Sequence, residues 1–285
     1  MTTVRRFFVG MLLPFFSIAC SKRQETPSVR TIPLTRTIRI PAQIMTSDTA
    51  LAPWRLNAGL LTTTGGGEDE LPQGPESFEV LPDGGFVIAD PLQRRVVFYD
   101  SLGNYVTVWP IGLAVNSITL REGGEFAVRQ ANSGDYFFVD QRGQVLPQSA
   151  QPRRRGGNTV PAEARLLDRN RGRIGEPRAR GATGGGIEIA FDSDTTQMVS
   201  LQNLGTDAQG NVYAVLEITQ GNSAAIDVRK IVRKYSAAGR LIAEILDLPL
   251  EAEIAPVDEL RLHRGCVYQL VPARTEVRIN VWDTN

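Results

Sequence analysis

Short apolar runs separated by turn residues follow one another along most of the chain after residue 74. The first unit has four such runs, at Phe78 to Leu81, Phe86 to Ala89, Arg95 to Tyr99 and Tyr105 to Trp109. Their length and their β-branched and aromatic content predict strands. Pro82-Asp83-Gly84-Gly85 and Asp100-Ser101-Leu102-Gly103 predict tight turns, because glycine supplies the positive φ that such turns require. The unit therefore predicts four strands joined by short turns.

The same pattern recurs at a fixed offset. Ser77, Gly84, Asp100 and Gly103 return 40 residues later as Ser117, Gly124, Asp140 and Gly143. Four-stranded units at a period of about 40 residues are typical of propeller blades. Units at 75–110, 114–150, 201–248 and 255–283 follow this pattern. The gap at 151–200 has room for one more, carried by Ile187 to Phe191 and Gln197 to Leu201.

The last unit ends after its third strand, so a strand from elsewhere must complete it. Ile38-Arg39-Ile40 and Trp54-Arg55-Leu56 are both candidates, since closure by an N-terminal strand removes the free sheet edges of a ring. We therefore predict an all-β fold, a single β-propeller of five or six four-stranded blades over residues 51–285. A two-domain β protein is the alternative, because sandwiches also have short strands at regular spacing.

The first unit also resembles a known repeat. Residues 74–103, with Asp83-Gly84, Ala89-Asp90, Arg95-Val96 and Phe98, are similar to the NHL-type β-propeller repeat. Later copies keep Gly210-Asn211-Val212-Tyr213 and Gly265-Cys266-Val267-Tyr268, among others. The resemblance favours six blades and implies that Asp90 caps its own turn.

The N-terminus predicts export. Arg5 and Arg6 precede an uncharged, mostly apolar run to Ala19, which is too short to span a bilayer and is typical of a signal peptide over residues 1–19. Cys20 follows a small residue at the end of this run, which resembles the lipobox of bacterial lipoproteins, although Ser17 stands where that family usually has leucine. The resemblance implies an acylated Cys20, a tether over residues 20–50, and a membrane-anchored protein on the periplasmic face or cell surface, with the outer membrane favoured. A signal peptide without lipidation is the alternative.

Composition excludes several kinds of site. One histidine and two cysteines are too few for a Cys/His zinc site, a multi-histidine metal centre or a disulfide framework, so we expect no metal and no cofactor. NHL-like lyases depend on metal-ligating histidines that this chain lacks. The single His263 is expected to be an ordinary surface residue, and Cys266 a small strand residue.

Charge is unevenly distributed. Residues 151–182 contain nine arginines against three acids, and we expect an Arg-rich insertion here. Such a segment can bind an anion or a partner, but it is also what a solvated loop looks like. Nucleic-acid binding is not expected, because no aromatic residues accompany the arginines. The candidate binding residues are Arg153, Arg154, Arg155, Arg169, Arg171 and Arg173.

No sequence motif identifies a reaction. We expect a monomeric binding or scaffolding module for an envelope protein, a peptide or a glycan. The alternative is an enzyme that acts on an envelope polymer through carboxylate and arginine side chains. A propeller would bind through its face loops, here Asp90 to Arg95, Gln130 to Asp135, Thr219 to Asp227 and Val271 to Glu276.

Overall fold

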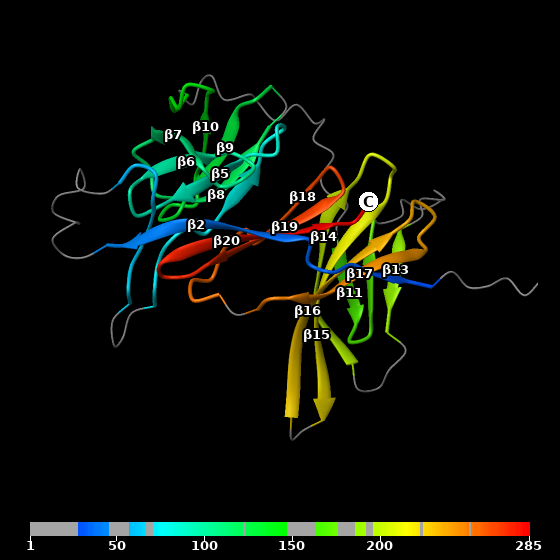
Figure 1. The fold of residues 1–285 in the computed structure, drawn as a ribbon. Helices are drawn as coiled ribbons and strands as arrows, with labels where there is room; N and C mark the ends of the chain where they lie inside the picture. Colours follow the sequence, from blue (N-terminus) through cyan, green and yellow to red (C-terminus); the bar gives the residue numbers. More distant parts are fainter. Residues whose placement is uncertain are drawn as a thin grey trace, which may run out of the picture.

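Strands alone form the regular secondary structure that is described (Figure 1). The computed structural model describes residues 28–45, 57–66, 71–121, 123–146, 164–175, 186–191, 196–222, 225–250 and 252–285. Within these ranges no helix is present, and therefore none that could cross a membrane. The predicted all-β class is confirmed.

The strands form five sheets that follow one another along the chain. The first sheet contains β4 (Phe78–Val80), β5 (Phe86–Asp90), β6 (Arg95–Tyr99) and β7 (Tyr105–Pro110), and the second contains β8 (Val115–Leu120), β9 (Phe126–Gln130) and β10 (Tyr136–Val139). The third contains β11 (Ala164–Asp168), β12 (Arg171–Ile174) and β13 (Ile187–Ala190). The fourth contains β14 (Thr196–Thr206), β15 (Val212–Asn222), β16 (Ala225–Tyr235), β17 (Leu241–Leu248) and β1 (Arg30–Thr31). The fifth contains β18 (Leu260–His263), β19 (Cys266–Pro272), β20 (Glu276–Asp283), β2 (Arg36–Ile44) and β3 (Leu61–Thr63).

Four hydrophobic cores join these sheets face to face. The first and second sheets share one core, and the first and fifth sheets share another. The fourth sheet shares one core with the fifth sheet and one with the third. Among the described residues, no core joins the second sheet to the third. The result is a propeller-like arrangement of consecutive meandering sheets, with the fifth sheet in the middle (Figure 1).

The N-terminal segment completes the last sheet. β2 pairs antiparallel with β20, with Ile38 opposite Ile279 and Ile40 opposite Val277. Ile40 is fully buried in the core shared with the first sheet. The prediction that Ile38-Arg39-Ile40 closes the last unit is confirmed, while the other candidate, Trp54 to Leu56, lies outside the described residues.

The sequence repeat corresponds to repeated turns. Asp100 accepts hydrogen bonds from the backbone N–H groups of Leu102 and Asn104, and Asp140 does the same for Arg142 and Gln144. Gly103 and Gly143 follow with φ of 86° and 79°. In each copy the aspartate and the glycine therefore fix the same turn, which explains why both residues recur.

Three predicted boundaries are corrected. Residues 164–174, expected within the Arg-rich insertion at 151–182, form β11 and β12 of the third sheet. Gln197 to Leu201 belongs to β14 of the fourth sheet and not to the additional unit. Residues 30–44, expected within the tether, supply β1 and β2, so the expected tether is shortened to the residues before Arg30.

Candidate functional site

A polar cleft of about 260 Å³ lies where the fourth sheet faces the segment that leads into β18. β14, β15 and β16 supply one wall, and residues 256–261 supply the other. The side chains with hydrogen-bonding or charged groups are Ser200, Gln202, Glu217, Lys230, Asp258, Glu259 and Arg261. The cleft thus lies between two successive sheets, where the first strands of both, β14 and β18, contribute residues.

Lys230 forms ion pairs with carboxylates of both walls. Its Nζ lies 2.5 Å from Glu259 Oε2 on one wall and 3.3 Å from Glu217 Oε1 on the other. Gln269 donates its amide N–H to the second oxygen of Glu259, at 2.5 Å. Burial alone would lower the pKa of Lys230, but the hydrogen bonds and charges of Glu259 and Glu217 outweigh burial and raise it. Lys230 is therefore held as an ammonium ion.

Arg261 joins three sheets at the far side of the cleft. Its guanidinium lies 3.5 Å from Glu79 of β4 and 3.3 Å from Asp258, and it donates to the Ile118 carbonyl of β8 at 3.1 Å. Burial raises the pKa of Glu79, and Arg261 opposes that effect. Ser77 donates to Asp258 and accepts from the Ile118 N–H, so the first, second and fifth sheets meet in one hydrogen-bonded cluster.

The cleft can hold a polar ligand. Its lining contains three carboxylates against one ammonium and one guanidinium, so acceptors are in excess and groups that donate hydrogen bonds are favoured. No aromatic side chain lines it. Within the described ranges, no group of three or more His, Cys, Asp or Glu residues is placed to hold a metal ion.

The structure does not bring the predicted arginines into this cleft. Arg153, Arg154 and Arg155 lie outside the described residues, as does Cys20. Arg171, the exposed first residue of β12, pairs with Asp168 at 2.7 Å. Arg169 and Arg173 also lie in or beside this hairpin of the third sheet and not among the cleft-lining residues.

Other residues singled out in the sequence have structural roles. Asp90 accepts a weak hydrogen bond from the Gln93 N–H within its own turn, at 3.4 Å, and pairs with Arg95 at 2.9 Å in a buried position. His263 is half-buried, and burial followed by the charge of Arg264 lowers its pKa. Cys266 is also half-buried, packs against the core between the fifth and first sheets, and forms no disulfide with a described residue.

Two of the four expected face loops are shorter than predicted. β15 continues to Asn222 and β16 begins at Ala225, so most of the segment from Thr219 to Asp227 is strand. β19 continues to Pro272 and β20 begins at Glu276. The other two turns, after Asp90 and after Gln130, lie where the sequence predicts them.

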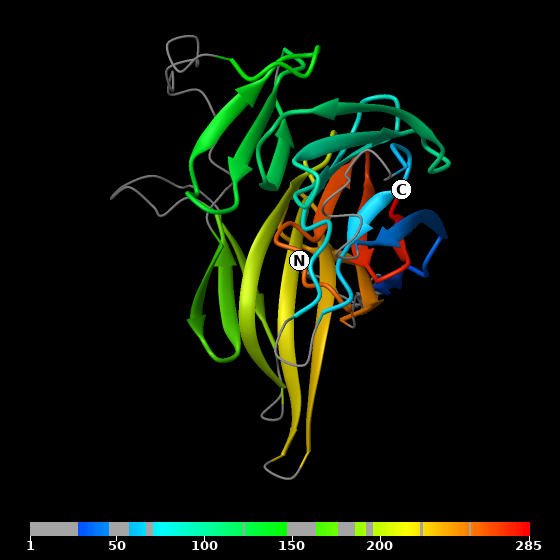
Figure 2. The ribbon, with the colours of Figure 1, turned by 90° about the vertical axis from the view of Figure 1, so that its left-hand side faces the viewer.

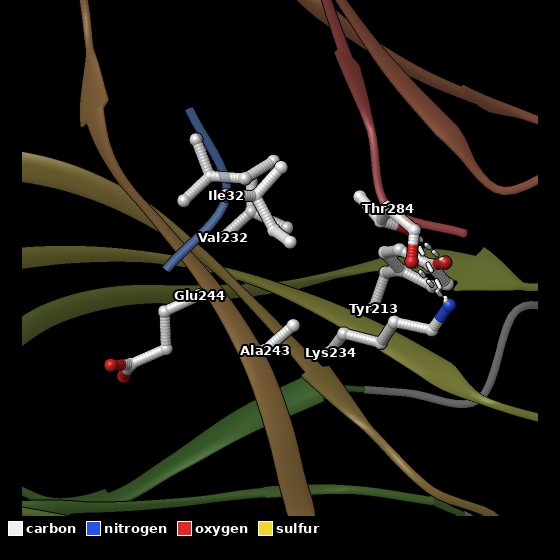
Figure 3. Close-up of a pocket in the computed structure, with 8 residues that line it drawn as sticks. Ile32, Tyr213, Val232, Lys234, Ala243, Glu244 and Thr284 are labelled. Carbon is white, nitrogen blue, oxygen red and sulfur yellow. Dashed lines mark hydrogen bonds between the residues drawn. The ribbon is translucent and has the colours of Figure 1, made fainter. Parts of the chain in front are cut away.

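A second polar cluster, between the fourth and fifth sheets, holds the C-terminal residues (Figure 3). The hydroxyls of Tyr213 and Thr284 lie 2.6 Å apart, and Lys234 donates to the Thr284 carbonyl at 3.2 Å. Lys234 also pairs with Asp207 at 3.2 Å, where the Asp207 carboxylate is almost fully buried. The neighbouring cavity has no room for a water molecule, so this cluster is structural.

Asp207 should make folding stability depend on acid. Burial alone would raise its pKa, but hydrogen bonds from Asn211 and Lys234 outweigh burial and lower it from 3.8 to about 2. A lowered pKa contributes stability above pH 3.8 that is lost as the pH falls toward 2.

We expect Asp207→Asn to lose about 1–3 kcal/mol of folding stability at neutral pH and to lose less further stability on acidification than the wild type. Urea denaturation at several pH values measures both. Asp135→Asn, at an exposed carboxylate, is the control, and an equal effect there would contradict the role of Asp207.

These observations define an all-β, propeller-like protein whose successive sheets share cores and whose last sheet is completed by an N-terminal strand. No protein-family model and no curated protein matches the sequence.

Similar solved structures have low identity to this chain. A member of the DUF4221 family from Bacteroides vulgatus has 8% identity and a TM-score of 0.30, with 88% of this chain and 97% of that chain covered. A gluconolactonase from Xanthomonas campestris has 10% identity and a TM-score of 0.31, with 87% and 98% covered. Streptogramin B lyase has 10% identity and a TM-score of 0.31, with 76% and 85% covered. These values assign no activity to this chain.

Proposed function

We propose that this protein is an exported, membrane-tethered lipoprotein whose propeller-like body binds a protein, peptide or glycan of the cell envelope. The observation that carries the binding role is the polar cleft between the fourth and fifth sheets, with its excess of carboxylates over cationic groups. The apolar run before Cys20 supports the tether and the location, with the outer membrane favoured.

The pairing of the charges in the cleft favours binding over catalysis. Lys230 is protonated between two carboxylates, so its nitrogen has no lone pair for nucleophilic attack. Arg261 is engaged by Glu79, Asp258 and a backbone carbonyl. Rigid, mutually paired groups of this kind orient a ligand and give specificity.

The tether is tested by comparing the wild type with Cys20→Ala. Intact-mass analysis of the wild type should show loss of residues 1–19 and the added mass of acyl chains, and the protein should fractionate with membranes. The variant should lack the acyl mass and lose the membrane association. A wild type that is released like the variant, without added mass, would contradict the tether.

The binding role is tested by photo-crosslinking from within the cleft. A benzophenone amino acid at Gln202, an exposed lining residue, is expected to capture a specific envelope component. The same group at Ser133, an exposed turn residue outside the cleft, is the control. Equal capture from both positions would contradict a binding cleft. Turnover of an envelope polymer that depends on Glu217 or Asp258 would instead support the alternative, an enzyme that acts on such a polymer.

A further inference from the structure

The hairpin of β15 and β16 extends beyond its neighbours on one side. The ladder between these strands continues to Asn222 opposite Ala225, but the last pair between β16 and β17 is Lys230 with Leu248. Figure 2 shows the two strands projecting past the rest of the sheet. Within the described residues, the main chain of Ala225 to Arg229 therefore has a strand partner on one edge only.

Beside this free edge lies a groove of about 420 Å³ whose lining is partly apolar and partly charged. Its apolar lining residues are Val228, Leu246, Leu248, Pro249 and Leu250, and its charged ones are Asp227, Arg229 and Lys230. Val228 is 49% exposed and Ile226 69%. Free edges with apolar side chains pair readily with another extended chain unless charged residues on the edge prevent it. Here the charges of Asp227 and Arg229 are paired with each other, at 2.6 Å.

The groove and the polar cleft share a lining residue. Lys230 lines both of them. Val228 and Lys230 are two positions apart on β16, so their side chains lie on the same face of the strand. Glu217 is opposite Lys230 in the ladder and is therefore also on this face. A chain lying along the free edge would thus have an apolar surface at one end and carboxylates at the other.

We propose that the occupant of this surface is an extended peptide of a partner protein, with apolar residues at alternate positions and one lysine or arginine. This inference rests on the proposed binding function and names its ligand. The peptide adds as a strand antiparallel to β16 along Ala225 to Arg229, which satisfies the free main-chain groups. Its apolar side chains occupy the groove, and its cationic side chain lies at Glu217 and Glu259, where carboxylates outnumber cations.

Two other occupants fit this surface less well. A glycan has no backbone amides to continue the ladder, and no aromatic side chain lines either cavity for a sugar ring to stack on. A second copy of β16 in antiparallel pairing would continue into the position beside Lys230 that Leu248 already occupies. A short peptide can instead end at Arg229 and reach Glu217 with its side chain alone.

The experiment measures, by anisotropy, binding of a fluorescent heptapeptide with valine at alternate positions and a lysine at its N-terminal end, the end that lies toward Lys230 in the antiparallel arrangement. Val228→Asp is expected to weaken binding about tenfold or more, equivalent to 1.4 kcal/mol. Val106→Asp, at a 59% exposed valine in the outer strand of the first sheet, is the matched control and should bind like the wild type. Glu217→Gln should weaken the lysine peptide severalfold but leave a norleucine peptide unchanged, and Glu188→Gln should change neither.

The main-chain contribution is tested on the peptide itself. N-methylation of every second residue, in two alternate phases, blocks one edge of the peptide at a time. Only one phase should lose binding, because only one edge faces β16.

Peptide binding that survives Val228→Asp, or that is equally strong for the lysine and norleucine peptides, would overturn the inference, as would no binding at all. If Gln202 still captures a glycan when the peptides fail, the binding function stands and only the peptide assignment is lost. If neither experiment gives a ligand, both the binding function and the peptide assignment are overturned.

Discussion

Replacing Arg261 with methionine is expected to destabilise the fold by about 3–5 kcal/mol, because removing one partner of a buried ion cluster leaves the others uncompensated. Glu79 and Asp258 would both lose their cation, and Ile118 would lose a donor to its carbonyl. The side chains of Arg261 and Glu79 are 19% and 15% exposed, so water replaces little of the lost interaction. Urea denaturation followed by tryptophan fluorescence measures the loss.

The pH dependence of this variant identifies the cause. Burial already raises the pKa of Glu79 from 4.5, and loss of Arg261, which lowers it, raises it further. Below the pKa of the unfolded chain, Glu79 is neutral in both states, and the penalty appears only as the pH rises above that value. The deficit relative to the wild type should therefore be smaller near pH 4.5 than at pH 7.

Two further variants control this prediction. Adding Glu79→Gln to Arg261→Met should recover part of the lost stability, since the buried charge is removed. Arg171→Met, at a pair in which both side chains are about half exposed, should cost less than about 1 kcal/mol. Equal losses at the two arginines would show that Arg261 does not act through the buried cluster.

Ile40→Ala is expected to cost about 2–5 kcal/mol, the range for truncating a fully buried isoleucine. Ile40 is 0% exposed, and its core also contains Phe78 and Ile88 of the first sheet and Leu270 of the fifth. The cavity would therefore open between the two sheets that the N-terminal strand holds together. Thermal and urea unfolding should both show the loss.

Ile44→Ala is the matched control on the same strand. Ile44 is 41% exposed, so its truncation should change stability by less than about 0.5 kcal/mol. A large loss at Ile44, or a negligible one at Ile40, would contradict closure of the last sheet through the buried face of β2.

The strands of the first unit follow directly from local sequence. The predicted run at 95–99 coincides with β6, and the other three runs differ from β4, β5 and β7 by one residue at one end. Each is bounded by turn residues whose conformations are set locally, such as Gly84 and Gly103 at positive φ. β11 was missed because its sequence, Ala-Arg-Leu-Leu-Asp, has no period-two alternation, and four of its five residues are exposed.

The candidate cleft could not be predicted from local patterns. Glu217 and Lys230 lie opposite each other in the ladder of β15 and β16. Glu259 meets Lys230 only because the fourth sheet packs on the fifth. One signal was available: the chain has only three lysines, and both Lys230 and Lys234 make ion pairs in poorly exposed positions. The nine arginines of residues 151–182 indicate a charged segment but do not indicate what that segment faces.

The pairing of β2 with β20 joins residues more than 200 positions apart, as in the hydrogen bond from Thr37 to Asn280. During synthesis, β2 emerges early and has no antiparallel partner until almost the whole chain has been made. Contacts of such long sequence separation slow folding, and the open edge of β2 that awaits β20 invites aggregation in the meantime. The nascent chain should therefore depend on a holding chaperone, and any message truncated near its 3′ end should yield a product that is degraded.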